Sequence, residues 1–268
     1  MEKLIDTVEK IISGNKELPF SVYSSIKEQK LLNVPIVKPL LIVVLEGEKY
    51  LGKDGDIVCH AGDFIFLADS PAIDMRNIPK EKSYFALLID FSPLDFSGLN
   101  SSNFSGKYFS IGKTTLMLER CLQQFVESIW WAPKEIWSSR KREILELLCH
   151  MGHKDILSML GGHKVGYKLH ELFCANNFEA MAINDICHHL AMSESTLRRR
   201  LKSEGTSIQE VKDRARLGQG LHLLQTSKYS VGLIAQMCGY QSQSRFSERF
   251  KARFGLTPSE LKKTKMTG

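Results

Sequence analysis

The sequence predicts an α+β fold of two domains, a β-barrel or sandwich with flanking helices followed by an all-α domain. Three observations lead to this prediction. Short apolar runs broken by turn residues fill residues 20–111, the apolar spacing changes to a helical period from Thr114 onward, and basic residues gather toward the C-terminus. With 268 residues, 43% of them hydrophobic and 25% charged, the chain is long enough to build two cores.

The first domain should begin with a short amphipathic helix, because Leu4, Val8 and Ile11 recur at helical spacing before Gly14. Strands are then predicted at residues 39–45, 57–59, 64–67 and 84–89, with turns at 46–49, 53–56 and 61–63. Strands this short and this regularly punctuated favour a β-sandwich or small barrel over residues 20–112.

Two amphipathic helices are expected over residues 114–160. Their apolar stripes are Leu118, Cys121, Leu122, Phe125 and Ile129 in the first, and Ile144, Leu147, Leu148 and Met151 in the second. Pro133 breaks the first helix and so separates the two. Two such helices outside a barrel either close the barrel or form a dimer face. Gly161-Gly162 then marks a joint, which gives an N-terminal domain at 1–160, a linker at 161–164 and a second domain at 165–268.

Charge divides along the same line. Residues 165–268 hold 16 Lys and Arg against 9 Asp and Glu, whereas residues 1–164 hold 20 against 21. A basic second domain beside a nearly neutral first one suggests that one domain faces a polyanion. The six cysteines form no CxxC pair, no secretory signal is visible, and no apolar run is long enough to span a membrane. We therefore expect reduced thiols and a cytoplasmic protein without membrane contact.

Residues 183–203 have the pattern of a helix-turn-helix unit. A first helix keeps its apolar residues on one face: Ile183, Ile186 and Leu190. Ser193 is an N-cap residue for a second helix, in which Leu197 and Leu201 point to the core. The other face of that helix carries Ser195, Arg198, Arg199 and Lys202 toward solvent or a major groove.

The same arrangement returns after a long helix at about 207–225, which opens with a capping box of Ser207 and Glu210. A scaffold helix follows, with the apolar residues Val231, Leu233, Ile234 and Met237. Gly239 makes the turn, and Ser242 caps a second recognition helix. That helix should bury Phe246, Phe250 and Phe254 and expose Ser244, Arg245, Glu248 and Arg249. Gly255 ends it, and Thr257-Pro258-Ser259-Glu260 opens the last helix.

The run IAQMCGYQSQSRFSERFKARFGLTP at 234–258 resembles the signature of the AraC/XylS regulator family, and residues 165–263 fit that family's domain of seven helices. Upstream, residues 39–49, 61–63 and 84–89 are similar to the cupin-like effector domain of one AraC subgroup. The resemblance implies a DNA-binding domain with two readers, joined to a cupin-like sensor or dimerisation domain.

By position, the resemblance assigns base reading to Ser195, Arg198 and Arg199 in the first recognition helix and to Ser244, Arg245 and Glu248 in the second. Glu248 stands where the family commonly has arginine. It either accepts from cytosine or pairs with Arg245 or Arg249. The candidates for contact with the DNA backbone are Ser193, Thr196, Arg200, Lys202, Ser242, Arg249, Lys262 and Lys263.

Other clusters have plainer interpretations. An Arg-Arg-Arg run is usually a solvated face, but its place between an N-cap and a leucine pair in a doubled motif favours binding. Histidines and cysteines cluster at 59–60, 149–153 and 187–189 without the further ligands that a closed metal site needs. The sequence therefore predicts neither a metal nor a cofactor. Trp130, Trp131 and Trp137 fit packing at a helix–barrel or dimer contact better than a ligand pocket.

The leading hypothesis is a sequence-specific transcription regulator, in this family more often an activator, that binds double-stranded DNA and contacts RNA polymerase. A small effector or a regulatory protein would act on the N-terminal domain, with a homodimer through residues 114–160 as an open alternative. A second hypothesis is a cupin-type metal-dependent enzyme with an incidental basic tail, although His60 is the only histidine between residues 20 and 112. A third makes the N-terminal domain a docking module for a protein partner.

Overall fold

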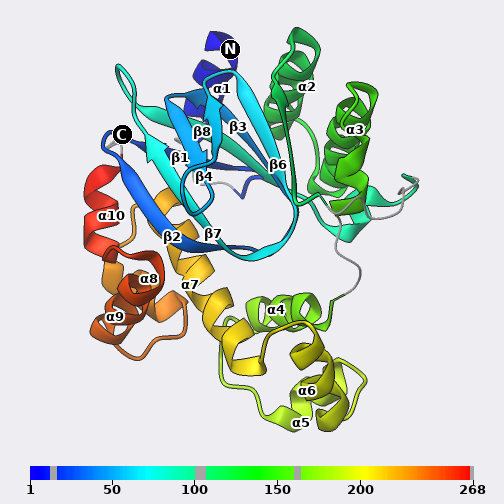
Figure 1. Ribbon diagram of the computed structural model, residues 1–268, viewed down its shortest axis with the longest axis vertical. Helices are drawn as coiled ribbons and strands as arrows, with labels where there is room; N and C mark the ends of the chain where they lie inside the picture. The colour runs from blue at the N-terminus through cyan, green and yellow to red at the C-terminus, as the bar shows by residue number, and fades with distance from the viewer. Residues whose placement is uncertain (13–16, 100–106, 160–163, 266–268) are drawn as a thin grey trace. The chain divides into compact units, whose positions relative to one another are not determined.

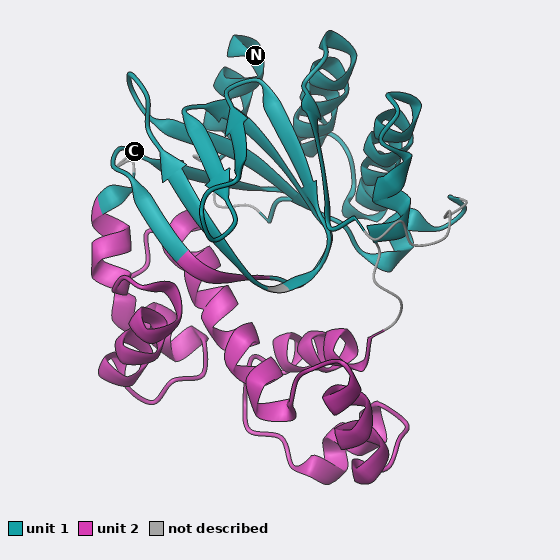
Figure 2. Cartoon of the chain, in the orientation of Figure 1, with its two compact units in different colours: residues 1–31, 36–160, 264–268 teal, residues 32–35, 161–263 magenta. Residues whose placement is uncertain are grey.

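A computed structural model describes residues 1–12, 17–99, 107–159 and 164–265. Its contacts divide the chain into two compact units, one of residues 1–31, 36–160 and 264–268 and one of residues 32–35 and 161–263 (Figure 2). The first unit combines strands and helices, and the second is helical apart from its short strand segment, so the α+β fold is as predicted. The predicted helix end at Gly14 and the Gly161-Gly162 joint lie outside the described residues. The domain bounds 1–160 and 165–268 stay a prediction.

Two antiparallel sheets form a β-sandwich in the first unit (Figure 1). The strands are β1 (Ser21–Ser25), β2 (Gln29–Ile36), β3 (Leu40–Glu46), β4 (Glu48–Leu51), β5 (Ile57–His60), β6 (Asp63–Leu67), β7 (Ser70–Ile78), β8 (Tyr84–Asp90) and β9 (Phe109–Lys113). One sheet has the order β1-β8-β3-β6-β9 and the other β2-β7-β4-β5. The four predicted strands are confirmed as β3, β5, β6 and β8. The other five were missed because polar residues and prolines interrupt their apolar pattern.

The central strands of the five-stranded sheet, β8, β3 and β6, are buried on both faces. Leu41 and Val43 of β3 and Phe64 of β6 pack in one core with the helices α1 (Glu2–Ile12), α2 (Leu116–Glu127) and α3 (Trp137–His150). The alternate residues Ile42 and Ile65 are buried on the opposite face, which is the inner face of the sandwich. Because neither face meets water, β3 reads as the continuous apolar run LLIVVL rather than as an alternating one.

The predicted turn at 46–49 is wrong in its length. Gly47 alone makes the bend, with φ at +76° and no room for a Cβ, which would lie 2.6 Å from the carbonyl oxygen of Ile78. Strand β4 begins directly afterwards at Glu48, so Lys49 belongs to a strand and not to a loop. Its side chain is buried in the first unit, with only 2% of its surface exposed.

Seven helices run through the described part of the second unit. They are α4 (Val165–Ala175), α5 (Ile183–His189), α6 (Glu194–Ser203), α7 (Ile208–Thr226), α8 (Val231–Met237), α9 (Gln243–Phe254) and α10 (Pro258–Thr264). Two helix-turn-helix units, α5–α6 and α8–α9, thus lie on either side of α7, as the sequence predicts (Figure 1). The scaffold helix α8 buries Ile234, whereas Leu233 and Met237 are 42% and 41% exposed. A helix of two turns buries one narrow face.

Helix α7 contributes to the core of both helix-turn-helix units. Its first half places Val211 and Ala215 in a cluster with residues of α4, α5 and α6. Its second half packs against α9, and a Cβ on Gly220 would lie 2.7 Å from the ring of Phe246. The rings of Phe246, Phe250 and Phe254 follow at centroid distances of 5.5 and 4.6 Å. All three are fully buried, which confirms them as core residues.

The turns of the two helix-turn-helix units differ in the residue that has positive φ. Ala191 makes the first turn at φ +50°, and Gly239 makes the second at +74°. A Cβ on Gly239 would lie 2.9 Å from both the carbonyl oxygen of Phe178 and Nη2 of Arg216. The second turn therefore requires glycine for space as well as for conformation, whereas the first accepts a side chain under strain.

We expect Gly239→Ala to lower the free energy of unfolding by about 2 kcal/mol or more, because it adds a clash with backbone to the strain of a left-handed alanine. The reciprocal change Ala191→Gly should raise the same quantity by about 0.5 kcal/mol, since it removes strain without a clash. Urea unfolding followed by far-ultraviolet circular dichroism measures both. Equal effects of the two substitutions would contradict this account of the turns.

Candidate nucleic-acid interface

Helix α6 presents its polar face because its cap and its leucines fix its orientation. The Ser193 hydroxyl accepts a hydrogen bond from the backbone N–H of Thr196, which satisfies a first-turn donor. Leu197 and Leu201 are buried in the core of the second unit. The base-reading candidates on the opposite face are consequently exposed: Ser195, Arg198 and Arg199.

The two arginine candidates of α6 are not equivalent. Arg198 Nε donates to Glu194 Oε1 at 2.7 Å, one helical turn away. Arg199 has no ion-pair partner among the described residues and extends from the helix without such a tether. An exposed pair of this kind contributes well under about 1 kcal/mol, but it holds one guanidinium in a preferred position.

The predicted backbone contacts near α6 divide into two groups. Ser193 and Thr196 are joined to each other, with 3.0 Å between their hydroxyl oxygens, and lie at the N-terminus of the helix. A helix N-terminus that carries exposed polar groups suits a phosphate. Arg200 and Lys202 are exposed farther along the helix and offer mobile positive charge.

Helix α9 repeats this construction. The Ser242 hydroxyl accepts from the backbone N–H of Arg245, and the helix ends at Gly255, with φ at +82°. With the phenylalanines buried, the exposed positions are those predicted: Ser244, Arg245, Glu248 and Arg249. The structure thus places both sets of candidates on outward helix faces, while their roles remain a prediction.

The alternative in which Glu248 pairs with Arg249 is not what the structure shows. Arg249 Nη2 donates instead to Asp213 Oδ2 of α7 at 2.6 Å. In the described part of the chain Glu248 forms no ion pair, so its carboxylate remains available for an outside partner. The ion pair with Asp213 also fixes α9 against α7.

The two C-terminal lysine candidates also differ in whether their side chains have a partner. Lys262 donates to the backbone carbonyl of Tyr229, and Lys263 is exposed. Both lie on α10, which begins with a capping box formed by Thr257 and Glu260. Glu260 accepts from the backbone N–H of Thr257, and this hydrogen bond holds the pKa of Glu260 below its usual value. Lys263 is therefore the freer phosphate candidate.

Arg216 connects the two halves of the second unit, and the sequence analysis did not find it. Its Nη2 donates to the carbonyl oxygen of Phe178, before α5, at 2.7 Å. Its guanidinium lies 5.7 Å from the centre of the Tyr240 ring, in the turn of the second helix-turn-helix unit. Glu204 has a similar role within the first half, because its carboxylate accepts from the backbone N–H groups of Val165 and Gly166 at 2.7 and 2.8 Å. Both contacts join residues that are far apart in the sequence, so no local pattern predicts them.

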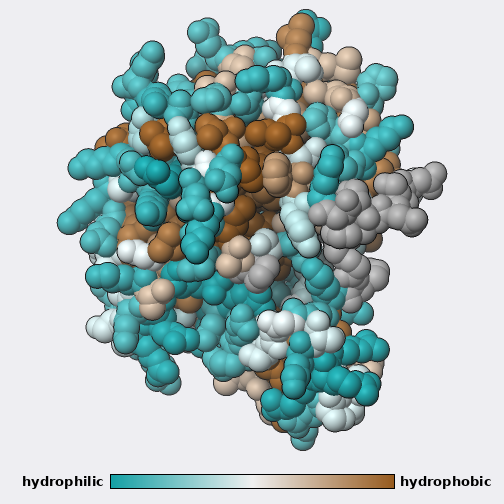
Figure 3. Space-filling view, viewed as in Figure 1, coloured by the Kyte–Doolittle hydropathy of each residue, from teal (hydrophilic) through white to brown (hydrophobic). Residues whose placement is uncertain are grey.

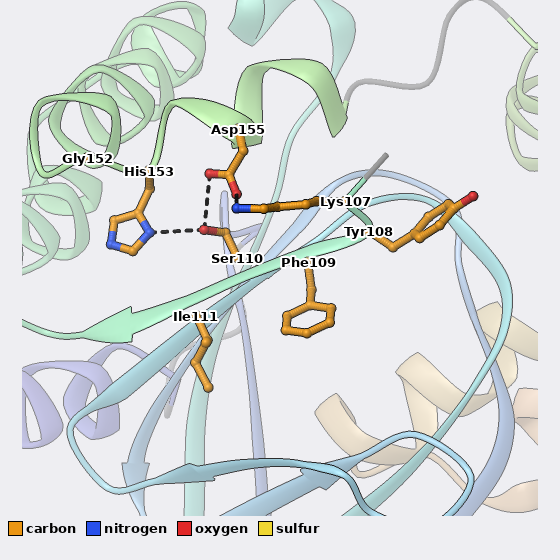
Figure 4. A pocket seen from close by; sticks show the side chains of 8 residues that line it. All are labelled: Lys107, Tyr108, Phe109, Ser110, Ile111, Gly152, His153 and Asp155. Atoms are coloured by element: carbon orange, nitrogen blue, oxygen red, sulfur yellow. Dashed lines mark hydrogen bonds and ion pairs between the residues drawn. The ribbon is translucent and has the colours of Figure 1, made fainter. Parts of the chain in front are cut away.

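A shallow hollow of about 640 Å³ lies along β9 in the first unit (Figure 4). Ser110, His153 and Asp155 meet there, with Ser110 Oγ 3.0 Å from His153 Nδ1 and 3.3 Å from Asp155 Oδ1. A catalytic triad needs the carboxylate on the second nitrogen of the histidine, whereas this carboxylate contacts the serine. His153 also packs edge-on against Phe64, at 5.0 Å between ring centroids. This cluster is a packing joint between β9 and the following helices.

Metal and redox chemistry receive no support from the described residues. They contain no group of three His, Cys, Asp or Glu residues placed to hold a metal ion. The six cysteines are free thiols. Burial raises the pKa of Cys59 and Cys121 to about 11 and that of Cys238 to about 12, so these thiols stay protonated and unreactive near neutral pH. None of the described helices combines the length and the apolar character needed to cross a membrane.

Residues 186–264 match a family model described as a Helix-turn-helix domain. Over 80 residues the chain is 36% identical to the urease operon transcriptional activator of Escherichia coli, a match that covers 30% of this chain and 27% of that protein. Over 233 residues it is 28% identical to the HTH-type transcriptional activator RhaS of Escherichia fergusonii, covering 82% of this chain and 81% of RhaS. The chain therefore spans under a third of the first relative but most of RhaS.

Among solved structures, an apo point variant of ToxT from Vibrio cholerae matches with a TM-score of 0.68 and 16% identity over 94% of this chain and all of that one. Wild-type ToxT bound to an unsaturated fatty acid matches with a TM-score of 0.65 and 16% identity, covering 92% of this chain and 95% of that one. At this identity the likeness shows a shared fold, a β-sandwich with helices followed by a helical domain.

We expect Arg216→Met to lower the free energy of unfolding by about 2 kcal/mol. The substitution leaves the carbonyl oxygen of Phe178 without the guanidinium donor and removes the contact with the Tyr240 ring. Arg200→Met is the matched control, since Arg200 is exposed on α6, and it should change stability by no more than about 0.5 kcal/mol. Chemical denaturation of the full chain compares them. A neutral Arg216→Met would mean that the two halves are held together by other contacts.

Proposed function

The chain belongs to the AraC/XylS family of helix-turn-helix transcription regulators, and we propose that it binds an asymmetric site on double-stranded DNA with both α6 and α9. One observation carries this proposal. Each of the two helices follows a tight turn, carries a capping serine and exposes a basic polar face, and both are mounted on α7. Two such readers fit successive major-groove faces about 34 Å apart on one side of the duplex.

The family is one of transcription factors and not of enzymes, and this decides against the hypothesis of a cupin-type enzyme with an incidental basic tail. We still propose that the N-terminal sandwich is a cupin-like sensor domain over residues 1–160. Apolar side chains gather over the strands on the face drawn in Figure 3, whereas the helices of the second unit present mostly polar ones there. That difference agrees with one domain that faces DNA and another with a separate task.

We assign the base contacts from the exposure of each side chain and from whether an ion pair restrains it. Arg199 and Arg245 are suited to guanine O6 and N7, and Glu248 to the amino group of cytosine. Arg198 reaches bases from a position set by Glu194. Ser195 and Ser244 contact either base type. Contacts to phosphate are assigned to Ser193, Thr196, Arg200, Lys202, Ser242, Arg249, Lys262 and Lys263.

A small effector acting on the sandwich is the regulatory part of the proposal. It is supported by the shared fold with ToxT, which has been crystallised with an unsaturated fatty acid. Binding would bias the arrangement of the two domains and so change DNA affinity or the contact with RNA polymerase. Activation rather than repression is supported by the names of two relatives, the urease operon activator and RhaS.

Dimerisation through residues 114–160 is a further part of the proposal. Four large apolar side chains of this region are mostly exposed: Leu116, Met117, Trp130 and Trp131. Exposed apolar groups at the start of α2 and just beyond its end are suited to a self-complementary contact.

Selection of a random DNA library with the full-length protein, at near-physiological salt, should recover an asymmetric site with two conserved blocks about one helical turn apart. If the full chain selects nothing while residues 165–268 alone select a site, the N-terminal domain restrains the readers. If neither selects a sequence, the proposal is wrong.

Single substitutions separate the two kinds of contact. Arg199→Ala and Arg245→Ala should each cost about 1–3 kcal/mol on the selected site and relax preference at one base position. Lys202→Ala should weaken binding about equally on specific and random DNA and reduce the salt slope by about 1. Electrophoretic mobility shift titrations at several salt concentrations distinguish them. An Arg199→Ala protein that keeps its base preference would contradict the assignment of α6 as a reader.

A further inference from the structure

One edge of the larger sheet is open. In the order β1-β8-β3-β6-β9 the strand β9 stands at the end, and among the described residues it pairs only with β6. The hollow of about 640 Å³ lies beside it, lined by residues 107–111 and by Gly152, His153 and Asp155 (Figure 4). The far side of β9 therefore faces a hollow and not a neighbouring strand.

The backbone groups that β9 turns toward this open side can be identified from its register. The carbonyl oxygen of Tyr108 accepts from the backbone N–H of Ala68 at 2.9 Å. Hydrogen-bonded pairs alternate along an antiparallel ladder, so the even-numbered residues of β9 direct their backbone groups to β6. The N–H and C=O groups of Phe109, Ile111 and Lys113 consequently point to the open side.

The side chains at this edge are apolar and exposed. Phe109 and Ile111 lie on one face of β9 and are 38% and 40% exposed, whereas Ser110 lies on the other face, toward His153 (Figure 4). The strand at the other edge of the same sheet, β1, contains no exposed large apolar side chain. An exposed apolar edge strand is a template for pairing with another strand.

The features that usually protect an edge strand are weak in β9. Natural edge strands carry lysines, prolines or bulges that discourage pairing. This strand contains no proline, and its register with β6 is unbroken. Lys113 Nζ lies 2.5 Å from Asp63 Oδ1, and Lys107 Nζ, just before the strand, lies 3.2 Å from Asp155 Oδ2. Both lysines are balanced by carboxylates of their own chain, so they repel an incoming strand less.

We propose that β9 pairs antiparallel with β9 of a second copy of this chain, about a two-fold axis at Ser110. In this register Phe109 lies opposite Ile111 of the second copy, and Ile111 lies opposite Phe109 of the second copy. Each of these pairs exchanges both of its backbone hydrogen bonds, because the groups concerned are those on the open side. The apolar side chains of the two copies then share one face and pack across the new strand pair.

Neighbouring registers match less well. A two-fold axis at Ile111 would place Phe109 opposite Lys113, and an axis at Phe109 would place Ile111 opposite Lys107. Of these three registers, the axis at Ser110 is the one that pairs apolar with apolar side chains. It places Lys107 opposite Lys113, and each of these lysines already has its carboxylate. The edge is thus self-complementary, which is what a two-fold dimer requires.

The inference rests on the proposed dimerisation and adds a strand pair to it. Leu116 and Met117, in the first turn of α2, are exposed and follow the end of β9 at Lys113 closely. The exposed apolar residues therefore continue from the strand into the region already proposed for dimerisation.

A cysteine cross-link in the full-length protein tests the register. Ser110 lies opposite Ser110 of the second copy in a pair without mutual hydrogen bonds, where Cα atoms are about 4.5 Å apart, within the span of a disulfide. Ser110→Cys should therefore form a covalent dimer with oxidised glutathione, seen on a non-reducing gel. Wild type gives the background of the six natural free thiols.

Phe109→Cys is the matched control for the cross-link. Its two copies lie diagonally across the strand pair, about 7–8 Å apart, so this variant should stay monomeric on the same gel. Absence of a covalent Ser110→Cys dimer, or equal cross-linking of the two variants, would overturn the proposed pairing.

Sedimentation equilibrium of the full-length protein measures the pairing without a cross-link. Ile111→Pro removes an N–H that the β6 ladder does not use, so β9 stays in its sheet while the second copy loses a donor. The dissociation constant of the dimer should rise at least about tenfold. Ile111→Ala, which keeps the N–H and loses more of the side chain, should weaken the dimer less. A monomeric wild type across the micromolar range, or equal dissociation constants for wild type and Ile111→Pro, contradicts the proposal. The cross-link does not depend on this variant, so it decides the question even if Ile111→Pro fails to fold.

Failure of this inference and failure of the other proposals give different results. A wild-type dimer that survives Ile111→Pro and does not cross-link through Ser110→Cys is held by residues 114–160, and only the strand pair is lost. A protein that cross-links through Ser110→Cys and selects no DNA site keeps the strand pair and loses the proposed function.

Discussion

The second unit depends on α7, which belongs to two cores at once. Its first half completes the cluster around α4, α5 and α6, and its second half receives Phe246 against Gly220. Arg216, between these halves, joins the carbonyl of Phe178 to the ring of Tyr240. Because one continuous helix supports both helix-turn-helix units, the positions of α6 and α9 are set by side-chain packing and not by a hinge.

The first unit follows a different constraint, which is that the central strands of its larger sheet have no face exposed to water. One face packs against three helices, and the other closes the sandwich. A polar group buried between the two sheets cannot reach water, so its hydrogen-bond partners must be other buried polar groups. Lys49, Asn77 and Gln29 therefore form a connected set of hydrogen bonds.

Local signals in the sequence predicted most of the second unit. Ser193, Ser207 and Ser242 each cap the helix that they were expected to cap, because capping depends on residues three positions apart. The sandwich was predicted less completely, since β1 and β9 alternate polar and apolar residues over only five positions. Lys49 was assigned to a turn because Gly47 stands beside it. Contacts such as that of Arg216 with Phe178 could not be predicted, because they depend on how distant segments meet.

The continuity of α7 has a consequence for the DNA. If α6 and α9 both enter the major groove as proposed, readers held at a fixed separation cannot adjust to a duplex whose grooves are out of phase with them, and such a duplex would have to bend or twist to meet both. Such bending costs about 1–6 kcal/mol, depending on the angle and on how deformable the sequence is. The base pairs between the two contacted blocks would then influence affinity through their stiffness, with flexible steps such as TA favoured at positions that no side chain touches.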